Sequence, residues 1–154
     1  MLNLFKKREK FILPVSGNCI PMEKVNDTVF SQKMMGDGFA IIPSDKTIYS
    51  PFSGEVSVLF PTKHAIGIKS DAGVEVLIHV GIDTVSLKGE GFESFVQQGD
   101  KITQGDKLID VDFDLIKQKG FDPVVVIIFT NNSIKIDEKL QHGEHHEKLS
   151  ISIK

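Results

Sequence analysis

The chain has 154 residues, of which 40% are hydrophobic and 25% are charged, as is typical of one globular domain with a single core. Its formal net charge of −3 gives no general attraction for nucleic acid, and its lone cysteine, Cys19, excludes an internal disulfide and indicates a reducing compartment. No apolar run is long enough to span a membrane, and the first residues lack the apolar core of a signal peptide, so we expect a cytoplasmic protein.

The chain begins with a basic stretch in which Leu2, Leu4 and Phe5 precede a cluster of lysines and an arginine. Such a tail could touch an anionic membrane surface, but a solvated terminus is the simpler interpretation. We expect at most a transient membrane contact. Residues 1–10 are therefore assigned to a tail and residues 11–154 to one domain.

Short β-branched segments, separated by glycine-containing turns, dominate the rest of the chain. We expect strands at residues 39–42, 56–60, 65–68, 74–80, 107–111, 124–130 and 149–153. Many short strands at close spacing predict an all-β fold, either an antiparallel β-sandwich or a barrel.

Helical turns are expected only at residues 92–98, before Gly99, and at residues 114–119, before Gly120. Residues 134–140 fit either a strand end or a helical turn. The sequence Pro-Val-Ser-Gly at residues 14–17 recurs as Pro-Phe-Ser-Gly at residues 51–54, which suggests an internal duplication with two halves packed face to face.

The expected strand at residues 74–80 carries an outward-facing histidine. Side chains on a strand alternate between its two faces, so its valines and isoleucine share one apolar face, which must point into the core. His79 shares the other face with Glu75 and Leu77, and Gly81 follows closely and leaves room for an approaching group. An outward histidine is, by itself, more often a plain surface residue.

A second histidine strengthens the case for a site. His64 precedes the expected strand at residues 65–68, which a turn at residues 70–73 joins to the His79 strand. A hairpin brings its two strands to about 4.8 Å, so His64 and His79 can be neighbours. Strict alternation would place His64 on the side of Ile66, but the register can shift by one residue at a strand end.

Two adjacent imidazoles suit two kinds of chemistry. They can serve as zinc ligands, although structural zinc needs four ligands and catalytic zinc three. Alternatively, one ring attacks phosphorus while the other donates a hydrogen bond to the phosphoryl oxygens. Histidine is substantially neutral at cell pH and keeps a lone pair for that attack.

The run Gly-Val-Glu-Val-Leu-Ile-His-Val-Gly-Ile-Asp-Thr-Val at residues 73–85, with Leu-Lys-Gly-Glu-Gly-Phe at residues 87–92, resembles the signature of a known family. This is the glucose-specific enzyme IIA family of the bacterial phosphoenolpyruvate:sugar phosphotransferase system. Thr-Lys-His-Ala at residues 62–65 is similar to the other active-site segment of the family, and the resemblance covers about residues 11–153. It implies an antiparallel β-sandwich that acts as a phosphocarrier in sugar uptake.

The resemblance also implies roles for individual residues. His79 would be phosphorylated on Nε2, His64 would stabilise the phosphoryl group, and Thr62 would orient His64. Asp83 would meet basic residues of the partners. An apolar rim around the histidine pair, suited to docking and to the exclusion of water, would consist of Val29, Phe30, Phe60, Leu77 and Val85.

The partners implied are HPr, whose phosphohistidine is the donor, and a IIB domain of a glucose-type IICB permease, whose cysteine is the acceptor. No cofactor is required. Zinc at His64 and His79 would need a carboxylate from a partner to complete the site. Regulatory partners and the identity of the sugar do not follow from the resemblance.

Two other classes of protein fit the sequence less well. Cell-wall zinc endopeptidases of a related β fold need a His-x-His pair on a strand, whereas residues 79–81 read His-Val-Gly. Lipoyl and biotinyl domains need a lysine at the tip of a hairpin, and Lys88 lacks the flanking residues of either type.

Three histidines and two glutamates lie within residues 142–147. His142, His145 and His146 could hold a transition metal. A solvated polar loop is the simpler interpretation, because loops tolerate such a composition freely.

Overall fold

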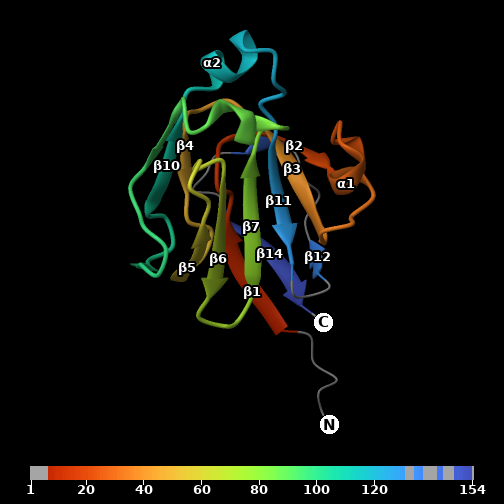
Figure 1. The fold of residues 1–154 in the computed structure, drawn as a ribbon. Helices are drawn as coiled ribbons and strands as arrows, with labels where there is room; N and C mark the ends of the chain where they lie inside the picture. Colours follow the sequence, from red (N-terminus) through yellow and green to blue (C-terminus); the bar gives the residue numbers. More distant parts are fainter. Residues whose placement is uncertain (1–6, 131–133, 137–141, 144–147, 154) are drawn as a thin grey trace.

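The computed structural model describes residues 7–130, 134–136, 142–143 and 148–153, and short antiparallel strands make up most of them (Figure 1). These strands form packed sheets with few and short helices, so the predicted all-β sandwich is confirmed. None of the helices in the described part of the chain has the length and apolar character that a membrane crossing requires.

The largest sheet has the strand order β13-β2-β3-β11-β7-β6-β5-β9. Its central strands, β11, β7 and β6, pair antiparallel without a register shift, and valine and isoleucine occupy most positions of β11 and half of those of β7. Its members are β2 (Gly17–Pro21), β3 (Asp37–Pro43), β5 (Gly54–Leu59), β6 (Ala65–Ser70), β7 (Glu75–Val80), β9 (Lys101–Ile102), β11 (Val125–Phe129) and β13 (His142–Gly143).

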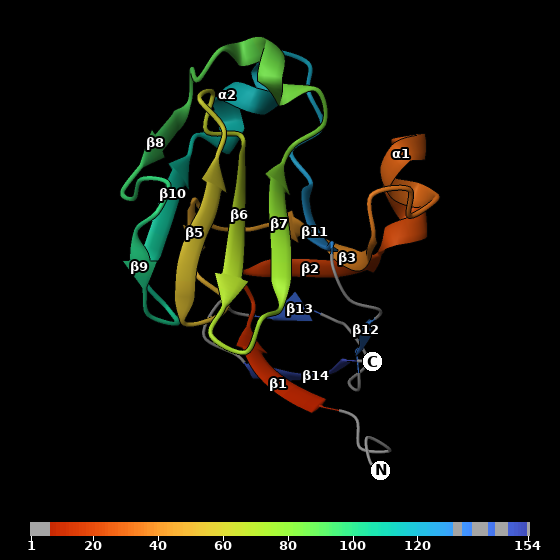
Figure 2. The ribbon, with the colours of Figure 1, turned by 60° about the horizontal axis from the view of Figure 1, so that its bottom comes forward.

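Two three-stranded sheets complete the fold. One has the order β4-β10-β8 and the other the order β1-β14-β12. Figure 2 shows β8, β9 and β10 grouped at one side of the molecule and α1 at the opposite side. The strands concerned are β4 (Thr47–Tyr49), β8 (Phe92–Ser94), β10 (Lys107–Val111), β1 (Lys7–Ile12), β12 (Ile134–Ile136) and β14 (Lys148–Ile153).

Strand β1 begins at Lys7 and pairs antiparallel with β14 up to Ile12. Four residues of the stretch assigned to a tail therefore belong to a strand, because β14 offers their backbone groups hydrogen-bonding partners. The segment at residues 1–6 lies outside the described residues. The division into a tail and one domain otherwise stays a prediction.

The main core is built around Phe11, which follows the basic stretch. Its ring lies 5.9 Å from that of Phe39, 5.7 Å from that of Phe52 and 5.8 Å from that of Phe129. All four side chains are buried. Aromatic side chains bury more apolar area than other residues, so this cluster joins β1, β3, β11 and the 51–54 segment.

A second apolar cluster covers the other face of the large sheet. The lobe at residues 22–36 contributes to this cluster and contains η1 (Met22–Lys24) and α1 (Thr28–Ser31). Phe30 of this lobe is buried in the same cluster as Leu77 and Val126. Its members are Met22, Val25, Phe30, Ala40, Ala65, Leu77, Ile82, Val124, Val126 and Ile128.

The helices follow local capping signals. The Asp27 carboxylate accepts a hydrogen bond from Val29 N at 2.9 Å at the start of α1, which the sequence reading did not predict. The predicted helix at residues 114–119 is confirmed as α2 (Phe113–Gln118), where Asp112 accepts from Leu115 N at 3.0 Å.

The predicted helical turn at residues 92–98 is wrong. Residues 92–94 form strand β8, in which Phe92 is buried and stands opposite Val111 of β10. Pairing with β10, which is distant in sequence, overrides the weak local helical preference. The ambiguous segment at residues 134–140 forms strand β12 at residues 134–136, and its remainder lies outside the described residues.

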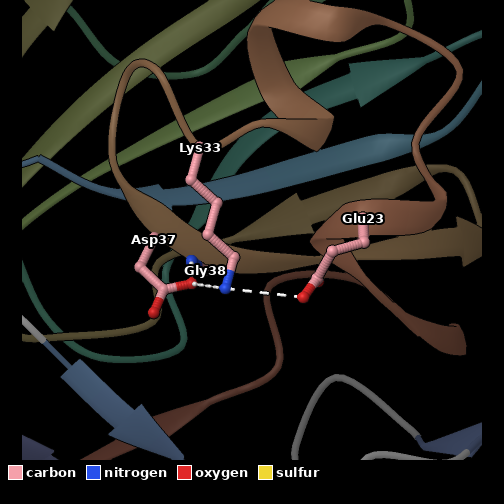
Figure 3. A network of polar contacts seen from close by, with 4 residues as sticks. All are labelled: Glu23, Lys33, Asp37 and Gly38. Atoms are coloured by element: carbon pink, nitrogen blue, oxygen red, sulfur yellow. Dashed lines mark hydrogen bonds and ion pairs between the residues drawn. The ribbon is translucent and has the colours of Figure 1, made fainter.

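An ion-pair network joins residues of the lobe to the first residue of β3 (Figure 3). Lys33 Nζ lies 3.2 Å from Asp37 Oδ1 and 3.6 Å from Glu23 Oε2. Asp37 Oδ1 also accepts a hydrogen bond from Gly38 N at 2.8 Å. The lysine therefore connects η1, the turn after α1 and the start of β3.

The two Pro-x-Ser-Gly motifs occupy equivalent positions. The carbonyl of Pro14, which begins the first motif, accepts a hydrogen bond from Tyr49 N at 2.7 Å. The carbonyl of Pro51, which begins the second motif, accepts one from Ile12 N at 3.2 Å. Tyr49 lies two residues before Pro51, and Ile12 lies two residues before Pro14. Each motif also ends at the glycine that begins a strand, β2 or β5. This reciprocal arrangement supports the predicted internal duplication.

Candidate functional site

His79 lies on β7, opposite Ala65 of β6 and Val126 of β11. Val76, Ile78 and Val80 are buried in the main core, so the predicted alternation is confirmed. The other face of the strand is less open than the sequence predicts, because the lobe at residues 22–36 covers part of it. Leu77 is buried there and His79 is half-buried.

His64 immediately precedes β6, and its carbonyl accepts a hydrogen bond from Val80 N at 2.7 Å. The ring centroids of His64 and His79 lie 5.1 Å apart, with their planes at 84°. The predicted proximity of the two histidines is confirmed. Strict alternation does not apply to His64 because β6 begins only at Ala65, and Lys63 makes the turn with a left-handed φ of 61°.

A backbone carbonyl selects the tautomer of His79. Its Nδ1 lies 2.8 Å from Gly81 O, and a carbonyl oxygen can only accept, so Nδ1 carries the proton in the neutral ring. Nε2 then keeps its lone pair. Gly81 has a φ of 77°, and a β-carbon there would come within 2.4 Å of Thr84 Cγ2. Glycine is therefore required where the chain places this carbonyl.

A hydroxyl group contacts the ring of His64. Thr62 Oγ1 lies 2.6 Å from His64 Nδ1. When the hydroxyl donates this hydrogen bond, Nδ1 is the acceptor and Nε2–H remains available as a donor. Such an arrangement presents one ring with a lone pair beside a second ring with a polar hydrogen.

Burial makes both rings harder to protonate. It lowers the pKa of His64 to about 4, with a smaller contribution from repulsion by a charge on His79. Burial also lowers the pKa of His79, while the hydrogen bond to Gly81 and the carboxylates of Asp27 and Asp83 act in the opposite direction. Both histidines are therefore neutral at pH 7.

Aromatic rings flank the pair on both sides. The Phe30 ring lies 5.0 Å from that of His79, and the Phe60 ring lies 5.3 Å from that of His64. Phe60 is partly exposed, whereas Phe30 is buried and forms a wall of the site rather than an open surface. Of the remaining predicted rim residues, Val29 and Val85 are exposed and Leu77 is buried.

Two carboxylates act on the electrostatics of His79. Asp83 was predicted at the site; it has a left-handed φ of 63° and precedes η2 (Thr84–Leu87). Asp27 was not predicted at the site. Its signal in the sequence is its position before Thr28, Val29 and Phe30, as a helix N-cap residue.

His64 is buried, with 4% of the residue exposed, whereas His79 is half-buried and reaches the surface. A groove of about 870 Å³ lies elsewhere, between α2 and the ends of β8 and β10. Within the described part of the chain, no group of three or more histidine, cysteine, aspartate or glutamate side chains could hold a metal ion. A half-buried histidine with exposed apolar side chains nearby suits a reaction with a protein partner.

Two other residues singled out in the sequence lie on β2 and β13. Cys19 is half-buried and packs against the main core. His142 belongs to β13 and stands opposite Asn18 of β2. His145 and His146 lie outside the described residues.

Comparison with known proteins identifies similar chains. Residues 9–134 match the model of the family "phosphoenolpyruvate-dependent sugar phosphotransferase system, EIIA 1". The chain is 47% identical over 125 residues to the PTS system glucose-specific EIIA component of Halalkalibacterium halodurans, covering 81% of this chain and 72% of that protein.

Two further matches extend this result. The chain is 50% identical over 134 residues to the PTS system glucosamine-specific EIICBA component of Bacillus subtilis, covering 87% of this chain but spanning only 21% of that protein. The solved structure of glucose permease IIA from Mycoplasma capricolum superposes with a TM-score of 0.90 at 41% identity, covering 97% of this chain and 99% of that one.

Proposed function

Because the chain belongs to the EIIA 1 family of the phosphoenolpyruvate-dependent sugar phosphotransferase system, and is a glucose-type EIIA phosphocarrier component of sugar uptake, we propose that His79 carries the phosphoryl group. The hydrogen bond from His79 Nδ1 to Gly81 O carries this proposal, because it leaves the lone pair on Nε2. Nε2 attacks the phosphorus of a phosphohistidine on HPr. The donor N–P bond breaks as the new N–P bond forms.

His64 stabilises the transferred group. Its Nε2–H donates to a phosphoryl oxygen as negative charge develops there, and the Thr62 hydroxyl holds the ring in the required tautomer. The ring centroids lie 5.1 Å apart, so an oxygen of a phosphoryl group on His79 Nε2 is within reach of the His64 ring. Phosphoryl transfer depends mainly on such positioning and charge stabilisation.

The surroundings of the pair serve the protein partners. Val29, Phe60 and Val85 are exposed apolar side chains that provide docking area. Phe30, whose ring lies 5.0 Å from that of His79, and the buried Leu77 keep water from the labile N–P bond. Asp83 meets basic residues of the partners.

The phosphoryl group passes from His79 to a cysteine of a IIB domain of a glucose-type permease. The cysteine thiolate attacks phosphorus, and the N–P bond to His79 breaks. The fusion of an EIIA-like segment to permease domains in the Bacillus subtilis relative supports such a partner. Because both proposed partners, HPr and the IIB domain, act in the cytoplasm, we expect this carrier to act there too.

The family generally requires no cofactor. Zinc, in this proposal, binds Nε2 of His64 and His79 only when a partner supplies a carboxylate, because the described residues bring no third side-chain ligand to the pair.

The decisive experiment is incubation of the protein with labelled phosphoenolpyruvate, enzyme I and HPr, followed by mapping of the label. We expect an acid-labile phosphate on His79 and no label on the His79→Gln variant. The His64→Gln variant, which keeps the nucleophile, is the matched control and should still be labelled. Label on any other residue of the wild-type protein would refute the assignment.

A further inference from the structure

The turn after α1 exposes two neighbouring methionines. Met34 is 69% exposed and Met35 is 43% exposed, whereas Met22, in the same lobe, is 1% exposed. Thioether side chains are apolar, so their exposure at two adjacent positions calls for an explanation.

The backbone holds these methionines at the surface. Before them, Lys33 has a left-handed φ of 58° and joins the ion-pair network with Glu23 and Asp37 (Figure 3). After them, Gly36 has a φ of 143°, and a β-carbon there would lie 2.5 Å from Phe129 O. The turn is therefore fixed on both sides, and the sulfur atoms stay accessible to small molecules in solution.

The same turn is continuous with the wall of the phosphoryl site. Met34 N donates a hydrogen bond to Val29 O at 3.0 Å, and Lys33 N donates one to Phe30 O at 2.9 Å. The Phe30 ring in turn contacts His79. A partner that reaches His79 across Val29 therefore also approaches this turn.

We propose that Met34 and Met35 form an oxidation site at which hydrogen peroxide slows the phosphoryl relay; this inference rests on the proposed function. A sulfur lone pair attacks one peroxide oxygen, the O–O bond breaks, an S–O bond forms, and the second oxygen leaves as water. The sulfur loses two electrons, which the peroxide gains. The resulting sulfoxide is polar and disrupts apolar contacts, and methionine sulfoxide reductases reverse it.

The test compares peroxide-treated and untreated protein. Peptide mass mapping should show oxygen added first at Met34 and Met35, with Met22 unchanged. Transfer from subsaturating phospho-HPr should slow about tenfold, the loss expected when one apolar side chain no longer contributes to docking. Treatment with both sulfoxide reductases should restore the rate.

A double variant, Met34→Leu with Met35→Leu, separates this site from other targets. It retains Cys19, Met1 and Met22, so its ratio of treated to untreated rate should stay near one. Equal slowing of this variant, equally fast oxidation of Met22, or an unchanged rate with both sulfoxides present would overturn the inference. Failure of the untreated protein to accept phosphate at all would instead refute the proposed function.

Discussion

The hydrogen bond from His79 Nδ1 to Gly81 O decides which ring nitrogen has a free lone pair. The residue that accepts it must be glycine, because its backbone is left-handed and its α-carbon faces Thr84. The sequence indicates Gly81 as a source of space near the histidine. Its second contribution, through the carbonyl, depends on a backbone direction that residue type alone does not specify.

Replacement of His64 by glutamine should separate the two halves of the relay. We expect acceptance from phospho-HPr to persist, while donation to the IIB domain falls about 10²–10³-fold, the cost of losing one charge-stabilising donor. Rapid-quench measurement of both steps checks this. A Thr62→Ser variant, which keeps the hydroxyl, is the control and should donate at nearly the normal rate. Donation by His64→Gln at the wild-type rate would contradict the role assigned to His64.

Protonation of His64 should weaken the fold in acid. Its pKa is about 4 in the folded protein, against about 6.5 when unfolded, so the unfolded state binds more protons as the pH falls. Stability is full above pH 6.5 and declines as the pH falls toward 4, by about 2 kcal/mol at pH 5 from this group. Urea unfolding of wild type and His64→Gln at pH 7 and pH 5 measures the difference. An equal decline in both proteins would rule out His64 as its source.

At the scale of elements, the lobe at residues 22–36 determines how much of the outer sheet face is accessible. It buries Leu77 and brings Phe30 against His79, although η1 and α1 are each only a few residues long. The ion pairs of Lys33 with Glu23 and Asp37 are largely exposed and contribute little free energy. The buried side chains of the lobe therefore account for most of its attachment.

A charged residue at the edge of the site should impair docking. Phe60 is partly exposed and its ring contacts that of His64, so we expect Phe60→Lys to weaken the complex with HPr about tenfold or more through loss of apolar burial. Isothermal titration calorimetry measures this affinity, and circular dichroism monitors the fold. Phe95→Lys, at an exposed position beside β8, is the matched control. The same affinity for Phe60→Lys and wild type would argue against a docking role for Phe60.

At the scale of the whole molecule, β1 connects the beginning of the domain to the main core. Phe11 at the end of β1 meets three other phenylalanine rings, and β1 pairs with β14 from the far end of the sequence. Contacts between such distant segments contribute to one cooperative core rather than to local stability.

Truncation of Phe11 should therefore destabilise the entire fold. We expect Phe11→Ala to lower the free energy of unfolding by about 3–5 kcal/mol, as is usual for a buried phenylalanine. Urea unfolding followed by circular dichroism measures this loss, and Phe11→Leu, with a smaller expected loss, serves if the alanine variant does not fold. Phe95→Ala, at an exposed position, should change little. Wild-type stability of Phe11→Ala would show that β1 is dispensable.

The sequence alone was sufficient for the fold class, the face of β7 that carries His79 and the proximity of His64. These follow from strand alternation and from a short hairpin, both of which are local properties. It did not predict α1, whose Phe30 is buried in a cluster with residues from elsewhere in the chain. It assigned residues 92–94 to a helix, although their state depends on pairing with β10. Only the tertiary structure decided that the outer face of β7 is half-covered, since the lobe at residues 22–36 approaches it from elsewhere in the fold. It also decided that Gly81 O orients the His79 ring, since this depends on a backbone direction that residue type alone does not specify.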